Sequence, residues 1–205
     1  MLRVHRIPFS TNVERVALAA AHKGVEVEWV DHRADDRSAV RALSGQDLVP
    51  VAELDGDVVV ESMAIVERLE ALAPDPPLYP ADPARRAVTD VFVAWFNGVW
   101  KVAPNALADE LDGPDPDPAR IVELGGLIAS RLQIFEDLLV AGDFLLGDRL
   151  SAADVCAFPF LKYGLLHDPD DTETFHRVLM EHQPLGDLHP RVRAWIERVD
   201  ALPRA

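Results

Sequence analysis

Hydrophobic positions in residues 1–75 follow two alternating periods. Residues 2–7 read as a short strand, and the apolar positions from 13 to 21 then recur at helical spacing until Lys23-Gly24, a typical helix end. Val25, Val27 and Trp29 alternate with acidic residues, which is the period of a strand with one wet face. These patterns predict a β-α-β unit.

The same region is predicted to continue with a hairpin and a final helix. A short helix is expected near residues 38–43, and two strands are expected on either side of the tight-turn sequence Asp55-Gly56-Asp57. Apolar residues then recur at helical spacing from Ser62 to Leu72. The order β-α-β-α-β-β-α predicts an α/β domain over residues 1–75, with a parallel unit followed by an antiparallel hairpin.

Prolines mark a boundary after this domain. Five of the 16 prolines fall within residues 74–83, a run that suits neither a helix nor a central strand, so we expect a linker over residues 76–85. Apolar residues then recur at helical spacing over residues 88–99 and again over residues 121–139. Pro104 is expected to end or kink the first of these helices. Asp117 and Pro118 suit a helix start. With shorter helices near residues 151–165, 173–182 and 190–202, residues 86–205 are predicted to be an all-α domain.

The composition and charge of the chain limit the kinds of partner that we expect. The 205 residues contain 20 Lys and Arg against 35 Asp and Glu, a formal charge of -15 that disfavours binding to nucleic acid and to anionic membrane surfaces. No apolar run approaches the roughly 18 residues of a membrane span, and cations interrupt the N-terminus, so we expect a cytoplasmic protein. Because Cys156 is the single cysteine and the histidines are scattered, neither an internal disulfide nor a metal site is expected.

Three short sequences in the first domain suggest a binding site. Pro50 either marks a strand edge or forms a cis peptide that exposes the backbone of Val49 to an extended, peptide-like ligand. Ser62 either caps a helix or joins its N-terminus in holding a carboxylate, while Glu61 holds an ammonium group. Ser10-Thr11-Asn12 either caps the first helix or offers a hydroxyl to a bound thiolate.

Taken together, these sequences resemble the cytosolic glutathione transferase superfamily. The resemblance rests on the motif from Ser10 to Val16, on Val49-Pro50, Asp55-Gly56, Glu61-Ser62 and Leu78-Tyr79-Pro80, and on the stretch from Phe144 to Asp154. The last resembles the buried N-capping box of that family, with Ser151 and Asp154 three residues apart. The likeness spans nearly the whole chain.

The resemblance implies a thioredoxin-like N-terminal domain that binds glutathione, a helical C-terminal domain and a homodimer. It places Val49 and cis-Pro50 on the cysteinyl part of glutathione and Glu61 and Ser62 on its γ-glutamyl end. Ser10 is the expected thiolate donor, with Thr11 and Asn12 as rivals. The protein is expected to be a detoxifying transferase, with glutathione as co-substrate and a small electrophile as substrate.

Two departures and two alternatives accompany this expectation. Leu48 stands where the family often has a polar residue before the Val-Pro pair, and no cysteine lies near Ser10, which disfavours a mixed-disulfide mechanism. One alternative is a glutathione-dependent cis-trans isomerase of the maleylacetoacetate or maleylpyruvate type. The other is a noncatalytic binding or assembly module built on the same scaffold.

Four aromatic residues are candidates for an apolar substrate pocket. Aromatic side chains at helical spacing also pack in protein cores, and both interpretations are open for these positions. The candidates are Phe9, Phe96, Trp100 and Tyr163.

Overall fold

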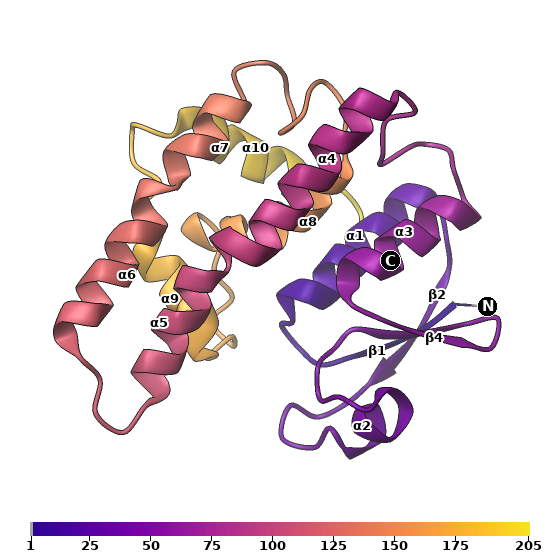
Figure 1. Cartoon of the computed structure of the whole chain (residues 1–205), viewed down its shortest axis with the longest axis horizontal. Coiled ribbons are helices and arrows are strands. Elements are labelled where there is room, and N and C mark those ends of the chain that lie inside the picture. The colour runs from indigo at the N-terminus through magenta and orange to yellow at the C-terminus, as the bar shows by residue number, and fades with distance from the viewer. Residues whose placement is uncertain (1) are drawn as a thin grey trace. The chain divides into compact units, whose positions relative to one another are not determined.

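A computed structural model describes residues 2–205, which form two compact units (Figure 1). The first contains the chain up to Tyr79 together with Leu202–Ala205, and the second contains Pro80–Ala201.

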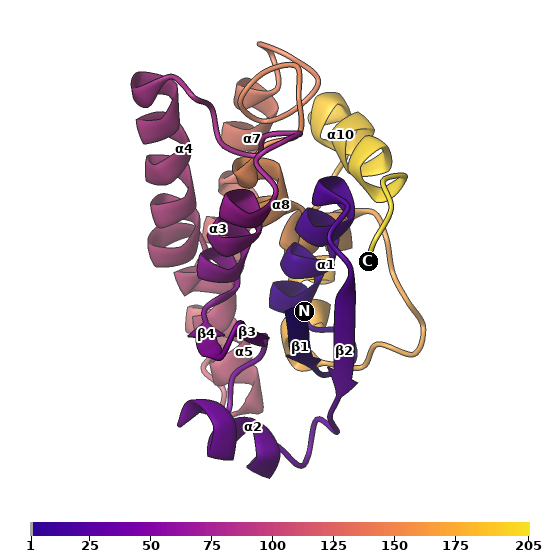
Figure 2. The same cartoon turned by 90° about the vertical axis from the view of Figure 1, so that its right-hand side faces the viewer.

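The N-terminal unit contains a four-stranded mixed sheet. Its strands are β1 (Leu2–Arg6), β2 (Val27–Asp31), β3 (Val51–Leu54) and β4 (Asp57–Val60), in the spatial order β2-β1-β3-β4. Strand β1 is parallel to β2 and antiparallel to β3, and β3 forms the hairpin with β4. Figure 2 shows β1 and β2 running side by side.

Three helices complete this unit: α1 (Thr11–Lys23), α2 (Ser38–Ser44) and α3 (Ser62–Leu72). Helices α1 and α3 pack against each other (Figure 1). A hydrophobic cluster joins Val13 of α1 and Val40 of α2 to Val49 and Val51 at the start of β3. The predicted order β-α-β-α-β-β-α and the thioredoxin-like fold are confirmed.

The end of α1 explains why β2 begins later than the alternation predicts. Gly24 has a left-handed φ of 63°, which glycine adopts without steric cost. This turn lets the Val25 N–H donate to the Ala20 carbonyl, so Val25 closes the helix instead of opening the strand.

Buried Lys23, in the last turn of α1, fixes the segment that follows α3. Its Nζ pairs with the Glu70 carboxylate and donates to the carbonyls of Pro74 and Pro76, the latter at 2.7 Å. Glu70 also accepts the Leu78 N–H at 3.0 Å. The proline-rich segment is therefore held to this unit by a buried ion pair.

The last residues of the chain also pack on the N-terminal unit. The Trp29 indole donates to the Ala205 carbonyl at 3.1 Å, and the Ala205 N–H donates to the Ala17 carbonyl. Arg204 forms an ion pair with Glu14 at 3.2 Å. The segment Leu202–Ala205 thus contacts both α1 and β2.

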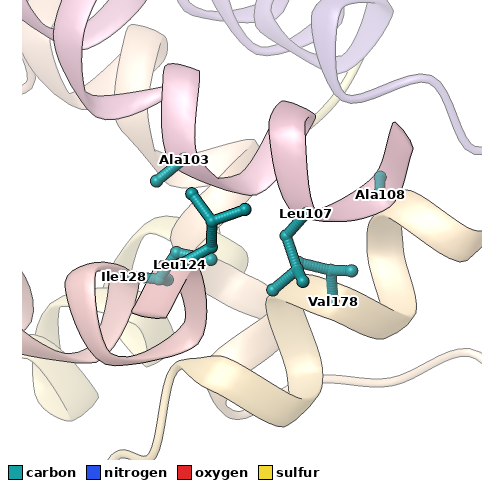
Figure 3. Packing of buried hydrophobic residues seen from close by; sticks show 6 residues of the cluster. All are labelled: Ala103, Leu107, Ala108, Leu124, Ile128 and Val178. Atoms are coloured by element: carbon teal, nitrogen blue, oxygen red, sulfur yellow. The ribbon is translucent and has the colours of Figure 1, made fainter. Parts of the chain in front are cut away.

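The second unit is helical throughout its regular structure, as predicted. Its elements are α4 (Pro83–Trp95), the π-helical turn η1 (Phe96–Trp100), α5 (Val102–Asp112), α6 (Pro118–Ser130), α7 (Leu132–Leu138), α8 (Ala152–Leu161), the 3₁₀ turn η2 (Lys162–Gly164), α9 (Thr174–His182) and α10 (Pro190–Asp200). Part of its core lies between α5, α6 and α9 (Figure 3), where Leu107, Leu124, Ile128 and Val178 are buried.

Pro104 accounts for the irregular backbone between α4 and α5. Proline has no N–H, so it leaves the carbonyl four residues before it without a helical donor. The Arg131 guanidinium supplies that bond, donating to the Trp100 carbonyl at 3.1 Å and to the Val99 carbonyl at 2.9 Å. The predicted interruption is confirmed, although it takes the form of a π-helical turn before Pro104.

Ser151 and Asp154 form the predicted capping box at the start of α8. The Asp154 carboxylate is buried and also accepts hydrogen bonds from the Leu145 N–H at 2.8 Å and the Trp195 indole at 2.9 Å. One carboxylate therefore connects a loop, the beginning of α8 and α10.

Candidate functional site

Ser10 lies at the N-terminus of α1 and caps it. Its Oγ accepts the Val13 N–H at 3.4 Å, and the residue is half-buried. A hydroxyl has one proton and two lone pairs, so a capping serine can still donate its proton to a ligand. Capping and ligand binding, the two interpretations of Ser10, are therefore compatible.

The N-terminus of α3 differs from the prediction that Ser62 caps it. Glu61 occupies the cap position with a φ of 70° and makes no side-chain capping bond, while Ser62 is already the first helical residue. The Ser62 hydroxyl instead accepts a hydrogen bond from Arg15 at 3.1 Å. The capping interpretation of Ser62 is therefore wrong, and the first-turn amides of α3 receive no side-chain cap.

Arg15 connects these two helix starts. Its side chain lies in α1 with 1% of its surface exposed, and its Nη1 donates to Asn12 Oδ1 and to Ser62 Oγ, each at 3.1 Å. The guanidinium is charged at every relevant pH and can only donate. It therefore places a permanent positive charge beside the N-termini of α1 and α3, whose dipoles have the same sign.

Arg15 also sets the direction of the hydrogen bonds at both of its partners. Because Ser62 Oγ accepts from the guanidinium, the Ser62 proton points elsewhere, where it can meet an acceptor. Because Asn12 Oδ1 faces the guanidinium, the Asn12 amide nitrogen is directed away from it. Two helix N-termini, a buried cation and a donor hydroxyl suit the binding of an anion.

Arg15 is the site residue that sequence reasoning missed, although it belongs to the quoted motif from Ser10 to Val16. The available signal was a cation three residues after Asn12 in a helix that is otherwise largely apolar. Buried arginine is rare unless it is hydrogen-bonded, so an arginine at such a position indicates a binding or structural role.

The backbone is unusual immediately before both serines. Among residues 2–205, the non-glycine residues with positive φ are Phe9, Asp55 and Glu61, of which Phe9 (57°) precedes Ser10 and Glu61 (70°) precedes Ser62. Non-glycine residues adopt this region at a cost, and such strain concentrates at functional sites.

Val49 and Pro50 lie at the entrance to β3, and the peptide between them is cis. The sheet ladders begin at Val51, so Val49 lies outside the paired part of β3. Leu48, the residue before it, is 60% exposed and offers no polar group.

The four aromatic candidates belong to two different units. Phe9 is exposed in the N-terminal unit, whereas Phe96 and Trp100 are buried in the helical unit and stack with ring centroids 4.5 Å apart. Tyr163 stacks on His176 and donates to Asp171 at 2.7 Å. The surroundings of the last three are those of core residues within their own unit.

No group of three or more His, Cys, Asp or Glu side chains within residues 2–205 is arranged to hold a metal ion. Within the same range, no helix combines the length and apolar character needed to cross a membrane.

The fold defines a protein with a thioredoxin-like N-terminal unit, in which two helix N-termini meet a buried arginine, and a helical unit. The profile described as "Glutathione S-transferase, N-terminal domain" matches residues 4–77, and the profile described as "Glutathione S-transferase, C-terminal domain" matches residues 122–203. The chain belongs to the glutathione S-transferase family.

Individual relatives agree with this assignment. The chain is 32% identical to maleylacetoacetate isomerase of Pseudomonas aeruginosa over 167 residues, or 74% of this chain and 76% of the relative. It is 29% identical to maleylacetoacetate isomerase of Mus musculus, over 71% of this chain and 69% of the relative. A theta class glutathione S-transferase from Xanthomonas axonopodis pv. citri, solved with glutathione bound, superposes with a TM-score of 0.74 at 25% identity, covering 98% of this chain and 93% of the other.

Proposed function

We propose that this protein is a glutathione-dependent enzyme that ionises the glutathione thiol and directs it at a small electrophile. The observation that carries the proposal is the buried Arg15, which joins the N-termini of α1 and α3 through Asn12 and Ser62. A family relative solved with glutathione bound supports the choice of thiol.

Each part of glutathione is assigned to residues of the N-terminal unit. The γ-glutamyl carboxylate is assigned to Ser62 and the first-turn amides of α3, and its ammonium group to the exposed carboxylate of Glu61. The cysteinyl backbone is assigned to Val49, which the sheet ladders leave unpaired before cis-Pro50. These assignments place the cysteinyl sulfur toward the N-terminus of α1.

Ser10 is the preferred donor to that sulfur. It is half-buried at the helix start, whereas Thr11 is buried. Asn12 stays a rival through its amide nitrogen, because its bond to Arg15 uses its oxygen. Phe9, which is exposed and precedes Ser10, is the aromatic residue we assign to the electrophile. Phe96, Trp100 and Tyr163 stay candidates of lower rank because they are buried in the helical unit.

The chemistry required of Ser10 is modest. A free thiol has a pKa near 8.5, so only about 3% is thiolate at pH 7. A hydrogen bond to a charged group contributes roughly 1.5–3 kcal/mol, which corresponds to about one to two pKa units. The dipole of α1 adds about 0.3–1 kcal/mol in the same direction. These contributions suffice to ionise most of the bound thiol at neutral pH.

A titration of bound glutathione tests this function. The ultraviolet absorbance of the thiolate, followed against pH, is expected to show a pKa about one to two units below that of free glutathione in the parent and a value near the free one in Ser10→Ala. Thr11→Val is the matched control and is expected to keep the parent value. An unshifted pKa in the parent contradicts the proposal, and a loss confined to Thr11→Val moves the donor role to Thr11.

The isomerase alternative has direct support, because relatives from Pseudomonas aeruginosa and Mus musculus carry that name. An isomerase uses the same activated sulfur but releases it after the double bond has rotated. Product analysis with maleylacetoacetate and with a simple electrophile separates the reactions, since conjugation consumes thiol and isomerisation leaves total thiol constant.

A homodimer in the cytoplasm is the state we propose for the enzyme. The family assignment supports dimerisation, and sedimentation of the purified protein at several concentrations tests it. A mass of one chain at all concentrations contradicts it. Failure to bind glutathione by calorimetry at millimolar ligand favours the noncatalytic module instead.

A further inference from the structure

Two histidines of the N-terminal unit are hydrogen-bonded to each other. His5 lies in β1 with a side chain 11% exposed, and His32 directly follows β2, the strand beside it (Figure 2). His5 Nδ1 and His32 Nε2 are 2.8 Å apart, and the ring planes differ by 17°. At this distance one nitrogen must carry a proton and the other must accept it.

Glu53 of β3 decides which nitrogen of His5 is protonated. Its Oε1 lies 3.0 Å from His5 Nε2, and the hydrogen bond from His5 holds the pKa of Glu53 below its usual range. Because an ionised carboxylate can only accept, His5 Nε2 carries a proton. Neutral His5 therefore presents the lone pair of Nδ1, which accepts from the Nε2–H of His32.

This arrangement has room for one additional proton. His32 can take a proton on Nδ1 without changing its bond to His5, and a charged donor strengthens that bond. A second proton would have to enter at His5 Nδ1, which is already the acceptor. It would break the bond and place two imidazolium rings side by side, where their like charges repel.

The charged groups around the pair come from all the neighbouring elements. They are Arg3 and Arg6 of β1, Glu28 and Asp31 of β2, Glu53 of β3, and Arg33, Asp35 and Asp36 after β2. Ion pairs join Arg3 to Glu28, Arg6 to Asp31 and Arg33 to Asp35, and Asp36 accepts from Ser38. Glu53 is the carboxylate within hydrogen-bond distance of His5, and its Oε1 also pairs with Arg3 at 3.6 Å.

The pair lies where the chain leaves the sheet. The His32 N–H donates to the Arg6 carbonyl at 2.8 Å, and residues 33–37 then lead into α2. Within that segment the Asp36 N–H donates to the Arg33 carbonyl at 3.3 Å. Breaking the bond between the imidazoles would remove the side-chain link of this segment to β1.

We propose that the hydrogen bond between His5 and His32 is a pH-sensitive switch. It holds residues 32–37 on the sheet with one shared proton, and it breaks and releases them when acid adds a second proton to the charged pair. Because the second proton enters a pair that already carries a positive charge, the release requires more acid than the first protonation. The device does not depend on the thiol chemistry proposed above.

Two measurements on the full chain test this switch. Ring resonances followed by NMR are expected to show that the pair takes up one proton between pH 8 and about 5.5. At lower pH the protection of the His32 and Asp36 amides against hydrogen exchange is expected to fall by up to about tenfold per pH unit, the slope of a one-proton event. In His32→Ala, His5 is expected to take up a proton of its own, and protection at Asp36 is expected to be lower and independent of pH.

His5→Gln provides a second variant that keeps a polar side chain, and in it His32 is expected to titrate alone. His167→Ala, which removes an exposed histidine of the helical unit, is the control and is expected to leave the parent behaviour unchanged. Independent uptake of two protons by the pair in the parent, or amide protection that does not change with pH, would overturn the proposal.

Discussion

Single residues carry the anion site that we propose for the N-terminal unit. Ser10 and Ser62 could be predicted as helix starts because small polar residues there precede apolar residues at helical spacing. The bond between Arg15 and Ser62 could not be predicted, since it joins residues 47 positions apart. Local pattern locates the two hydroxyls, but only the packing of α1 against α3 brings the guanidinium to one of them.

Ser62→Ala tests the γ-glutamyl end of the site. The substitution removes a proposed hydrogen bond to a carboxylate, which contributes about 1.5–3 kcal/mol. Affinity for glutathione, measured by calorimetry, is therefore expected to fall at least about tenfold. Ser38→Ala, at the first residue of α2, is the control and is expected to bind like the parent. Equal affinities in Ser62→Ala and the parent would contradict the assignment.

Asp171 makes the stability of the helical unit depend on pH. Burial alone would raise the pKa of Asp171, but hydrogen bonds from His176 and Tyr163 outweigh burial and hold it below its usual range. A carboxyl with a lowered native pKa stabilises the fold above the unfolded pKa of about 4, and this contribution disappears as pH falls through the native pKa.

Urea unfolding of Asp171→Asn between pH 5 and pH 2.5 checks this sign. The parent is expected to have the larger free energy of unfolding at pH 5, and the difference from the variant is expected to shrink toward pH 2.5. Asp170→Asn, an exposed neighbour, serves as the control. A difference between Asp171→Asn and the parent that stays constant with pH would refute the account.

Element boundaries show where local patterns succeed and fail. The capping box at Ser151 and Asp154 and the helix start at Asp117 and Pro118 were predictable, because each depends on residues within one turn. The start of β2 was predicted too early, since the periodic pattern cannot distinguish Val25 as a strand residue from Val25 closing the end of α1. The π-helical turn before Pro104 is bonded by Arg131, the residue between α6 and α7, which lies about 30 positions later in the sequence.

Asp154→Ala tests the contribution of the capping box at the start of α8 to stability. Loss of the cap costs about 1 kcal/mol, and the stranded donors of Leu145 and Trp195 add about 1–3 kcal/mol each. The free energy of unfolding from urea denaturation is expected to fall by at least about 3 kcal/mol. Ser151→Ala keeps the carboxylate and is expected to cost only about 1 kcal/mol. Equal stability of Asp154→Ala and the parent would be inconsistent with this role.

At the scale of the whole molecule, the order of the elements and the fold class of each unit could be predicted from the spacing of hydrophobic residues. The packing between residues far apart in the sequence could not. Nothing in the local sequence assigns Leu202–Ala205 to the N-terminal unit, because the contacts with Trp29, Ala17 and Glu14 join opposite ends of the chain. The same holds for Lys23, which looked only like a helix end and pairs with Glu70.

The central claim is that α1 receives the sulfur of glutathione at its N-terminus while α3 receives the γ-glutamyl carboxylate. A crystal structure of the protein with bound glutathione tests it most directly. We predict a sulfur within hydrogen-bond distance of Ser10 Oγ and a carboxylate on Ser62 and the first amides of α3. A sulfur directed away from residue 10, or a binding region left empty at saturating glutathione, would contradict the account.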